Sequence, residues 1–290
     1  MRRVLLIKRC CSFLAKATLF ILIVYGIGRF CHDKTDGFCI ENIRSELSVS
    51  SEESPSSDLL QEIFEQPFSY LCKGGQCYVF LSQDGKYVLK FFKQQHARLP
   101  WFIDHLYLPP FLAKIKEEKK NRQEKEFASY KIAYEELQEE TALVLLHLHK
   151  TSLLQKQVSL IDKLHIVHEI QLDDFAFLVQ RRAEGVFEHL EALIAKEKMQ
   201  EAKEAIHSLS LLFVKIREKK IFDMDPNISK NFGFLDSQAV QIDIGRFFKG
   251  ESFDSHSYFQ KKNEEFKQWL REKSPSLAQE FESECTRLSL

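Results

Sequence analysis

The chain has 290 residues, 44% of them hydrophobic, which is enough to bury one sizeable core or the two lobes of one domain. Its 41 basic and 42 acidic residues give a formal net charge of -1, without the basic excess of nucleic-acid-binding proteins, so we expect no nucleic-acid partner. The seven cysteines are unevenly spread, in a spacing that predicts neither a zinc site nor a disulfide framework.

The first thirty residues differ in kind from the rest. Residues 10–30 are mostly apolar, with Lys16 and Arg29 as the charged residues, and a basic run precedes them. A spanning helix needs about 20 apolar residues, and no small-x-small cleavage site follows this segment. We therefore expect residues 1–30 to be a single-pass transmembrane helix, with a removed signal peptide and a secreted protein as the alternative. The positive-inside rule places the N-terminus in the cytoplasm and the remaining chain on the far side.

Residues 31–65 are expected to form a flexible linker. Within them, residues 45–58 read SELSVSSEESPSSD, a serine- and acid-rich tract with one proline. Such a composition buries too little apolar surface to fold by itself. A phosphorylated regulatory tract is the alternative interpretation.

Residues 67–93 have the pattern of three consecutive strands. Two β-prone runs, 78–81 and 87–92, flank an Asp-Gly turn, and the Gly74-Gly75 pair precedes the first run. Lys90 places a charge inside the last strand. Taken alone, Lys90 is best interpreted as an ordinary solvated strand lysine. A functional role for it depends on which other residues accompany it in the sequence.

The pattern then changes from strands to helices. Trp101–Phe111 is an aromatic segment, and apolar residues at 127, 130, 134 and 137 predict a long helix that ends before Thr141. Because glutamates interleave the lysines of residues 114–126, we interpret that stretch as a solvated helix face. Further elements follow in chain order: strands at 165–172 and 175–180, helices at 186–194 and 199–216, a short strand at 239–244, and helices at 258–271 and 276–288.

Strands followed by helices predict an α+β protein with two lobes, an N-lobe over residues 66–185 and a C-lobe over residues 186–290. Between two of the C-lobe helices lie Asp225, Asn231 and Asp243, at the ends of predicted strands. Phosphoryl transfer needs an acid that orients the acceptor hydroxyl, oxygen ligands for Mg²⁺ and a lysine on the nucleotide phosphates. With Lys90, the chain carries all of these residue types in the required order.

On these residues the chain resembles the protein-kinase-like superfamily over about residues 66 to 270. Residues 73–80 resemble the glycine-rich loop and its second strand, residues 88–90 the strand of the phosphate-binding lysine, and residues 242–245 the Asp-Phe-Gly segment. The resemblance implies a two-lobed fold, with an antiparallel N-lobe sheet beside one long helix and a short, mostly helical C-lobe. The Asp225-Pro226 start and the short C-terminal half are more similar to bacterial kinases of lipopolysaccharide-core sugars than to peptide kinases.

The resemblance also implies roles for single residues, with ATP and Mg²⁺ as cofactors and a sugar or lipid-linked hydroxyl as acceptor. Asp225 would be the catalytic aspartate, which accepts the hydroxyl proton. The nucleotide would be bound by Gly74, Gly75 and Lys90, with Lys90 held by Glu126 or, as a substitute, Glu124. Mg²⁺ would be held by Asn231 and Asp243.

The sequence departs from the family at several positions. Cys72 and Cys77 replace two glycines of the loop, Asp223-Met224-Asp225 replaces His-Arg-Asp, and Asn231 lies six residues after Asp225 instead of five. The alternative function is therefore a catalytically inactive pseudokinase that binds a protein partner, through Trp101–Phe111, or a secreted effector. Cys72 and Cys77 flank a four-residue turn, where they either form a disulfide or replace glycine as small hydrophobic residues.

Overall fold

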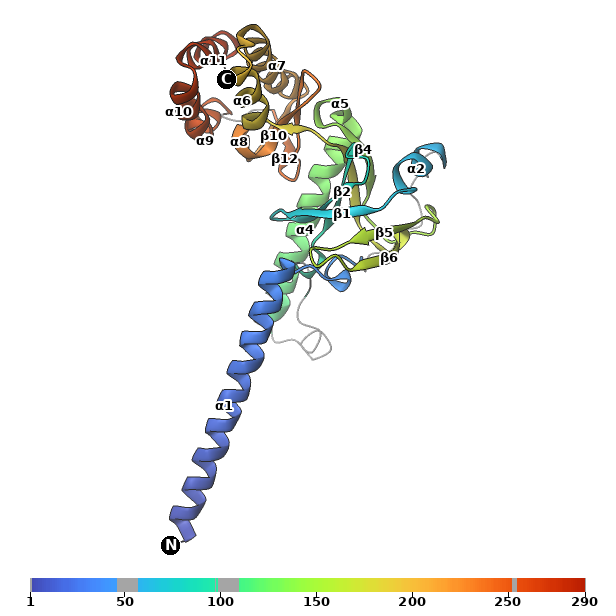
Figure 1. Ribbon diagram of the computed structural model, residues 1–290, viewed down its shortest axis with the longest axis vertical. Coiled ribbons are helices and arrows are strands. Elements are labelled where there is room, and N and C mark those ends of the chain that lie inside the picture. Colours follow the sequence, from blue (N-terminus) through green and yellow to red (C-terminus); the bar gives the residue numbers. More distant parts are fainter. Residues whose placement is uncertain (1, 46–56, 97, 99–109, 252–254, 290) are drawn as a thin grey trace.

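The structure is a computed structural model that describes residues 2–45, 57–96, 98, 110–251 and 255–289. Helix α1 (Arg2–Thr35) projects from the globular part as one long rod, as Figure 1 shows. Large apolar side chains of α1, including Phe13 and Phe20, are exposed. Among the described residues, no helix has both the length and the apolarity needed to cross a bilayer, so the transmembrane helix expected at residues 10–30 is not supported.

The N-lobe is built on a seven-stranded sheet in the order β4-β7-β3-β2-β1-β5-β6. Neighbouring strands are antiparallel except β1 and β5, which pair in parallel. The strands are β1 (Phe68–Lys73), β2 (Cys77–Ser82), β3 (Tyr87–Phe92), β4 (Leu143–His147), β5 (Gln157–Ile161), β6 (Val167–Gln171) and β7 (Phe177–Arg181). Strands β4 and β5 were not expected, because short apolar runs without turn residues at both ends do not distinguish strand from helix.

The linker expected at residues 31–65 packs in part on the N-lobe sheet. The turn η1 (Ile40–Asn42) and helix α2 (Ser57–Phe64) flank residues 46–56, which lie outside the described part of the chain. Buried side chains beside η1 and on α2 join one core cluster with the outer face of the sheet: Phe38, Ile43, Leu60, Ile63 and Phe64. This corrects the sequence expectation. Too few apolar residues occur here to show a period, yet the five named above are buried against the sheet.

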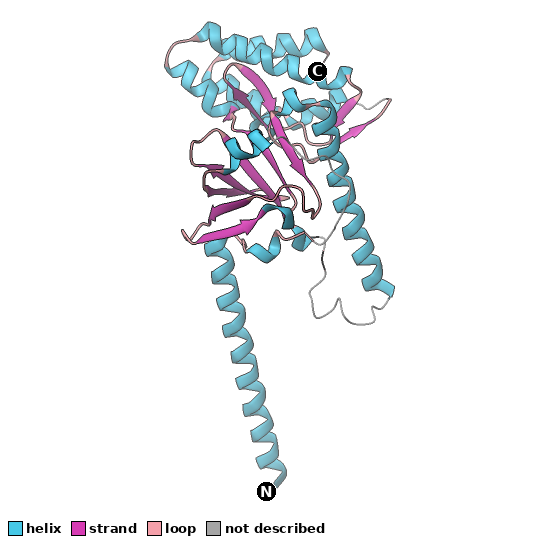
Figure 2. Ribbon diagram, turned by 90° about the vertical axis from the view of Figure 1, so that its right-hand side faces the viewer, coloured by secondary structure: helices cyan, strands magenta, loops and turns pink. Residues whose placement is uncertain are grey.

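The other face of the sheet is covered by α4 (Pro110–Glu136), the long helix expected from the apolar spacing. Figure 2 shows α4 running beside the strands, with the C-lobe helices gathered at the end of the molecule opposite α1. Of the aromatic segment Trp101–Phe111, only its last two residues are described, and Phe111 on α4 is exposed. The protein-partner surface expected there otherwise lies outside the described residues.

The C-lobe packs around α7 (Met199–Glu218), whose buried stripe includes Ala202, Ile206 and Leu209. Two small sheets, β11-β10-β8 and β12-β9, flank the segments that contain Asp225, Asn231 and Asp243. The remaining strands are β8 (Glu184–Gly185), β9 (Ile221–Asp223), β10 (Phe232–Leu235), β11 (Gln238–Gln241) and β12 (Phe247–Lys249). The remaining helices are η2 (Gln94–His96), α5 (Gln138–Thr141), η3 (Leu172–Asp174), α6 (Val186–Ala195), α8 (Ile228–Asn231), α9 (Ser255–Lys262), α10 (Glu264–Lys273) and α11 (Pro275–Leu288).

Candidate phosphotransfer site

Lys90 points from the middle of β3 toward the C-lobe. Its strand lies between β2 and β7, so the backbone is fixed on both sides. The Lys90 ammonium donates a hydrogen bond to the Ile242 carbonyl oxygen at 2.6 Å. Burial lowers the pKa of Lys90, and the nearby Asp243 carboxylate opposes that shift. A charged residue of the N-lobe sheet thus reaches the loop between β11 and β12.

Asn231 connects that loop to the loop after β9. Its carbonyl oxygen accepts hydrogen bonds from the backbone N–H groups of Ile242 at 2.7 Å and Asp243 at 3.3 Å. Its side-chain amide donates to the Asp225 carbonyl oxygen at 2.6 Å. The six-residue spacing from Asp225 therefore does not separate the two residues, because the short helix α8 takes up the chain between them.

Asp225 is held by a lysine from a separate helix. The ammonium of Lys262, on α9, lies 2.7 Å from a carboxylate oxygen of Asp225. Burial alone would raise the pKa of Asp225, but the hydrogen bond and charge of Lys262 outweigh it, so the pKa is lowered. Asp225 is consequently ionised at neutral pH, as an acceptor of a hydroxyl proton must be.

Asp223 is a site residue that the sequence analysis did not single out. One of its carboxyl oxygens accepts the backbone N–H of Asp225 at 2.8 Å, and the other accepts the Gln241 amide at 2.5 Å. Burial, followed by the charges of Asp225 and Asp243, raises its pKa to about 7. The signal in the sequence was the Asp223-Met224-Asp225 motif itself, in which Asp223 takes the place of the histidine of His-Arg-Asp.

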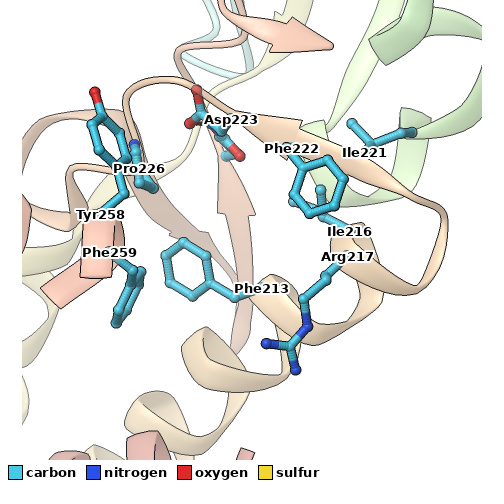
Figure 3. Close-up of a pocket in the computed structure, with 10 residues that line it drawn as sticks. Phe213, Ile216, Arg217, Ile221, Phe222, Asp223, Pro226, Tyr258 and Phe259 are labelled. Atoms are coloured by element: carbon cyan, nitrogen blue, oxygen red, sulfur yellow. Dashed lines mark hydrogen bonds between the residues drawn. The ribbon is translucent and has the colours of Figure 1, made fainter. Parts of the chain in front are cut away.

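An apolar cavity explains the burial of Asp223. Figure 3 shows the carboxyl group of Asp223 at the edge of a space surrounded by aromatic rings, among them Phe213, Phe222 and Phe259. The cavity has a volume of about 60 Å³, enough for water but too small for a nucleotide base. It is therefore the apolar surrounding of Asp223, and not a substrate pocket.

The chemistry of these residues fits Mg²⁺. Asp223, Asp225 and Asp243 are close enough for their charges to interact, and such crowding of carboxylates favours a bound cation. Asp243 and Asn231 are the oxygen donors that would hold it. In the described part of the chain, no group of three or more His, Cys, Asp or Glu is arranged to bind a metal by itself. Mg²⁺ commonly takes one or two carboxylates and completes its shell with substrate phosphates and water.

The expected partner of Lys90 is placed differently. Glu126 lies on α4 and pairs at 3.5 Å with Arg122, one turn earlier on the same helix. Burial raises the pKa of Glu126 against the opposing charge of Arg122. Glu124 pairs with Lys120 at 3.8 Å on the exposed face of α4. Among the described contacts neither glutamate reaches Lys90, whose partner is the backbone carbonyl of Ile242.

The glycine loop contacts the C-lobe through Gln76. The backbone N–H of Gly74 donates to the Cys77 carbonyl at 2.8 Å, and a Cβ at Gly75 would meet no atom within 4 Å. The Gln76 amide instead packs on Gly245 so closely that a Cβ there would clash with it, and accepts a hydrogen bond from the Tyr130 hydroxyl at 2.7 Å. Gly75 thus faces open space, a Cβ on Gly74 would contact the Cys77 carbonyl oxygen, and Gln76 closes the loop onto residues 242–245.

The two loop cysteines are both free thiols. Cys77 is buried, whereas Cys72 is exposed and pairs in register with Val79 instead of Cys77. Burial raises the pKa of the Cys77 thiol to about 12, so it is not a reactive thiolate at neutral pH. Only Cys77 therefore behaves as the small buried hydrophobic residue expected at both positions.

Comparison with known proteins finds a coarse likeness of fold. No family model and no curated protein matches the sequence. A solved structure of WbdD is 16% identical with a TM-score of 0.40, over 77% of this chain and 47% of that one. Another WbdD structure, described as a bifunctional kinase-methyltransferase, is 15% identical with a TM-score of 0.34, over 73% of this chain and 43% of that one. Rv3197 from Mycobacterium tuberculosis, solved with erythromycin, is 14% identical with a TM-score of 0.31, over 74% of this chain and 56% of that one.

The chain thus spans about half the length of these proteins. With TM-scores of 0.31 to 0.40 and identities of 14 to 16%, these structures do not assign the chain to a family.

Proposed function

We propose that this protein is an ATP-dependent phosphotransferase of kinase-like fold that transfers the γ-phosphate to a non-protein hydroxyl. The observation that carries the proposal is the convergence of Lys90, Asp225, Asn231 and Asp243. They come from β3, the loop after β9, α8 and the loop after β11, and hydrogen bonds of 2.6 to 3.3 Å connect these segments. An acid, two oxygen donors for a metal and a phosphate-binding cation are the groups that phosphoryl transfer requires.

The proposed mechanism depends mainly on positioning and charge. Lys90 would exchange the Ile242 carbonyl for the nucleotide phosphates. Bound Mg²⁺, held by Asp243 and Asn231, would neutralise the phosphate charge. Asp225 would orient the acceptor hydroxyl and take its proton, and Lys262 keeps that carboxylate ionised and fixed. The acceptor that best suits the resemblance at Asp225-Pro226 is a sugar or a lipid-linked hydroxyl.

A second candidate is a pseudokinase that binds a partner without catalysis. Two contacts favour it: Glu126 pairs with Arg122 in place of Lys90, and the Gln76 side chain packs on Gly245 beside the expected phosphate site. Both would have to rearrange before a nucleotide could bind as in an active kinase. The two candidates differ in whether Mg²⁺ and ATP bind together.

The test is thermal unfolding of the full chain in detergent with ATP, with and without Mg²⁺. We expect Mg²⁺ and ATP together to raise the melting temperature, because nucleotide at 100 times its Kd stabilises a protein by about 2.7 kcal/mol. Lys90→Ala and Asp243→Ala should lose this rise. Lys86→Ala, a lysine with 71% of its side chain exposed at the start of the same strand, should keep it. If millimolar Mg²⁺-ATP does not raise the melting temperature of well-folded wild type, the phosphotransferase proposal is wrong and the pseudokinase is the remaining candidate.

Membrane attachment is a separate proposal. We infer from the sequence of residues 10–30 that the N-terminus is cytoplasmic and that the folded part lies across the membrane. The exposure of apolar side chains such as Ile21 and Ile27 on α1 is compatible with a lipid surrounding. Alkaline carbonate extraction should leave the chain in the membrane pellet. Recovery of a shortened chain in the medium would support the secreted alternative.

A further inference from the structure

A second cavity lies beside the phosphotransfer residues, between the glycine loop, the end of β3 and the exposed half of α4. Its volume is about 440 Å³, large enough for a sugar phosphate. Four cationic side chains and one carboxylate line it: Lys93, Lys119, Arg122, Arg246 and Glu126. Lys90, Asp225, Asn231 and Asp243 are not part of this lining.

The side chains that line this cavity have a net positive charge, because four cations face a single carboxylate. The pKa of His96, which also lines it, is lowered by burial and then by the charges of Lys93, Arg122 and Lys119. A histidine surrounded by carboxylates would shift the opposite way. An anion entering this cavity would relieve the repulsion among the cations.

Two of the four cations, Lys93 and Lys119, are held by contacts within the protein. The Lys93 ammonium donates to the Gly74 carbonyl at 2.5 Å and lies 4.8 Å from the centre of the Tyr78 ring. The Lys119 ammonium donates to the Arg98 carbonyl at 3.0 Å. Positions 119, 122 and 126 fall on one face of α4, so the helix presents these groups together although acids interleave them in sequence. Pre-organised groups lose less conformational entropy on binding.

Arg246 connects the cavity with the reacting groups. It follows Gly245, and its carbonyl oxygen accepts the backbone N–H of Met224 at 3.1 Å, which ties it to the Asp225 loop. Its charge acts on both carboxylates: it contributes to the lowered pKa of Asp225 and opposes the rise that burial causes in the pKa of Glu126. The cavity is therefore next to the phosphotransfer residues but is lined by a different set of side chains.

We propose that this cavity binds the phosphate group of a phosphorylated acceptor, so that the substrate of the phosphotransferase already carries a phosphomonoester. A phosphomonoester dianion has the opposite charge to the two guanidinium and two ammonium groups. One guanidinium can also donate two parallel hydrogen bonds to two oxygens of a phosphate. The acceptor role depends on the proposed function, whereas phosphate binding does not. The phosphate comes either from a soluble sugar phosphate or from a lipid headgroup, and the two share this chemistry.

The test measures binding of glucose 6-phosphate to the full chain in detergent by calorimetry, with glucose as the uncharged comparison. Nanodiscs with and without phosphatidic acid form the lipid arm. We expect at least one phosphate probe to bind and glucose to fail. Arg122→Ala and Lys93→Ala should each weaken binding about tenfold. Lys125→Ala, an exposed lysine of the same helix outside this cavity, should not.

The competing explanations give different results. Failure of both phosphate probes, or equal binding of glucose, overturns the proposal. Simple competition between Mg²⁺-ATP and the bound probe also overturns it, since the cavity would then belong to the nucleotide. Phosphate binding in a chain that shows no response to ATP would preserve the phosphate site while the phosphotransferase function failed.

Discussion

At the scale of single residues, Asp223 is a carboxyl group whose ionisation changes near neutral pH. Its pKa is raised from 3.8 to about 7 by burial first, and then by Asp225 and Asp243. Below pH 3.8 both the folded and unfolded chains carry the proton, so folding loses nothing. As the pH rises to 7, the unfolded chain ionises while the folded chain does not, and folding stability falls. Each pKa unit corresponds to about 1.4 kcal/mol, so the loss reaches roughly 4 kcal/mol above pH 7.

Replacing Asp223 with asparagine should remove this pH dependence. We expect the wild type to lose stability relative to Asp223→Asn between pH 4 and pH 7, and the difference to stay constant above pH 7.5. Urea unfolding at several pH values measures it. Asp236→Asn, which changes an aspartate in the turn between β10 and β11, should follow the wild-type profile. Parallel profiles for wild type and Asp223→Asn would show that Asp223 is ionised in the folded protein throughout.

At the scale of elements, the connection between the lobes depends on one glycine. Strand β8, the first segment after the N-lobe sheet, pairs with β10 where Gly185 faces Gly233. A Cβ on Gly233 would lie 2.5 Å from the Glu184 carbonyl oxygen, closer than any stable contact. The atoms that this Cβ would meet belong to the Glu184 backbone and the short Ala183 side chain, which cannot rotate away. The two strands would therefore have to separate.

Gly233→Ala should therefore destabilise the protein by about 1 to 3 kcal/mol, the usual cost of overpacking. Gly75→Ala is the matched control, because its Cβ would meet no atom within 4 Å. That control should stay within about 0.5 kcal/mol of wild type. Equal melting temperatures for the two variants would mean that β8 moves away from β10 at little cost.

The elements also show what the sequence can and cannot predict. The hairpins around Asp84-Gly85 were predictable because turn chemistry and strand propensity agree locally. The pairing of Glu126 was not, since it depends on how α4 is rotated against the sheet. Glu126 pairs with Arg122, one turn earlier on α4, while Lys90 bonds the Ile242 carbonyl oxygen. The cluster of cations around the second cavity was not predictable for the same reason. Only the folded helix α4 brings Lys119 and Arg122 to the same cavity as Lys93 and Arg246.

At the scale of the whole molecule, the N-lobe begins earlier than its first strand. Asp36, just after α1, pairs with Lys73 at 3.1 Å and Lys163 at 2.8 Å, which lowers its pKa. The Tyr78 hydroxyl donates to the Gly37 carbonyl at 2.7 Å. These contacts join the end of α1 to the strands that hold the glycine loop.

Phe38 should therefore matter to folding as much as a residue of the sheet. Its ring is buried, 5.3 Å from the Tyr78 ring and 5.2 Å from the Phe80 ring, measured between centroids. Phe38→Ala should lower the free energy of unfolding by about 3 to 5 kcal/mol, because it leaves a cavity in this aromatic cluster. Phe30→Ala, which changes the same residue type at 62% exposure on α1, should change it little. Denaturant unfolding of both variants in detergent measures these free energies. Equal effects of Phe38→Ala and Phe30→Ala would mean that residues 36–45 form a linker outside the folded core.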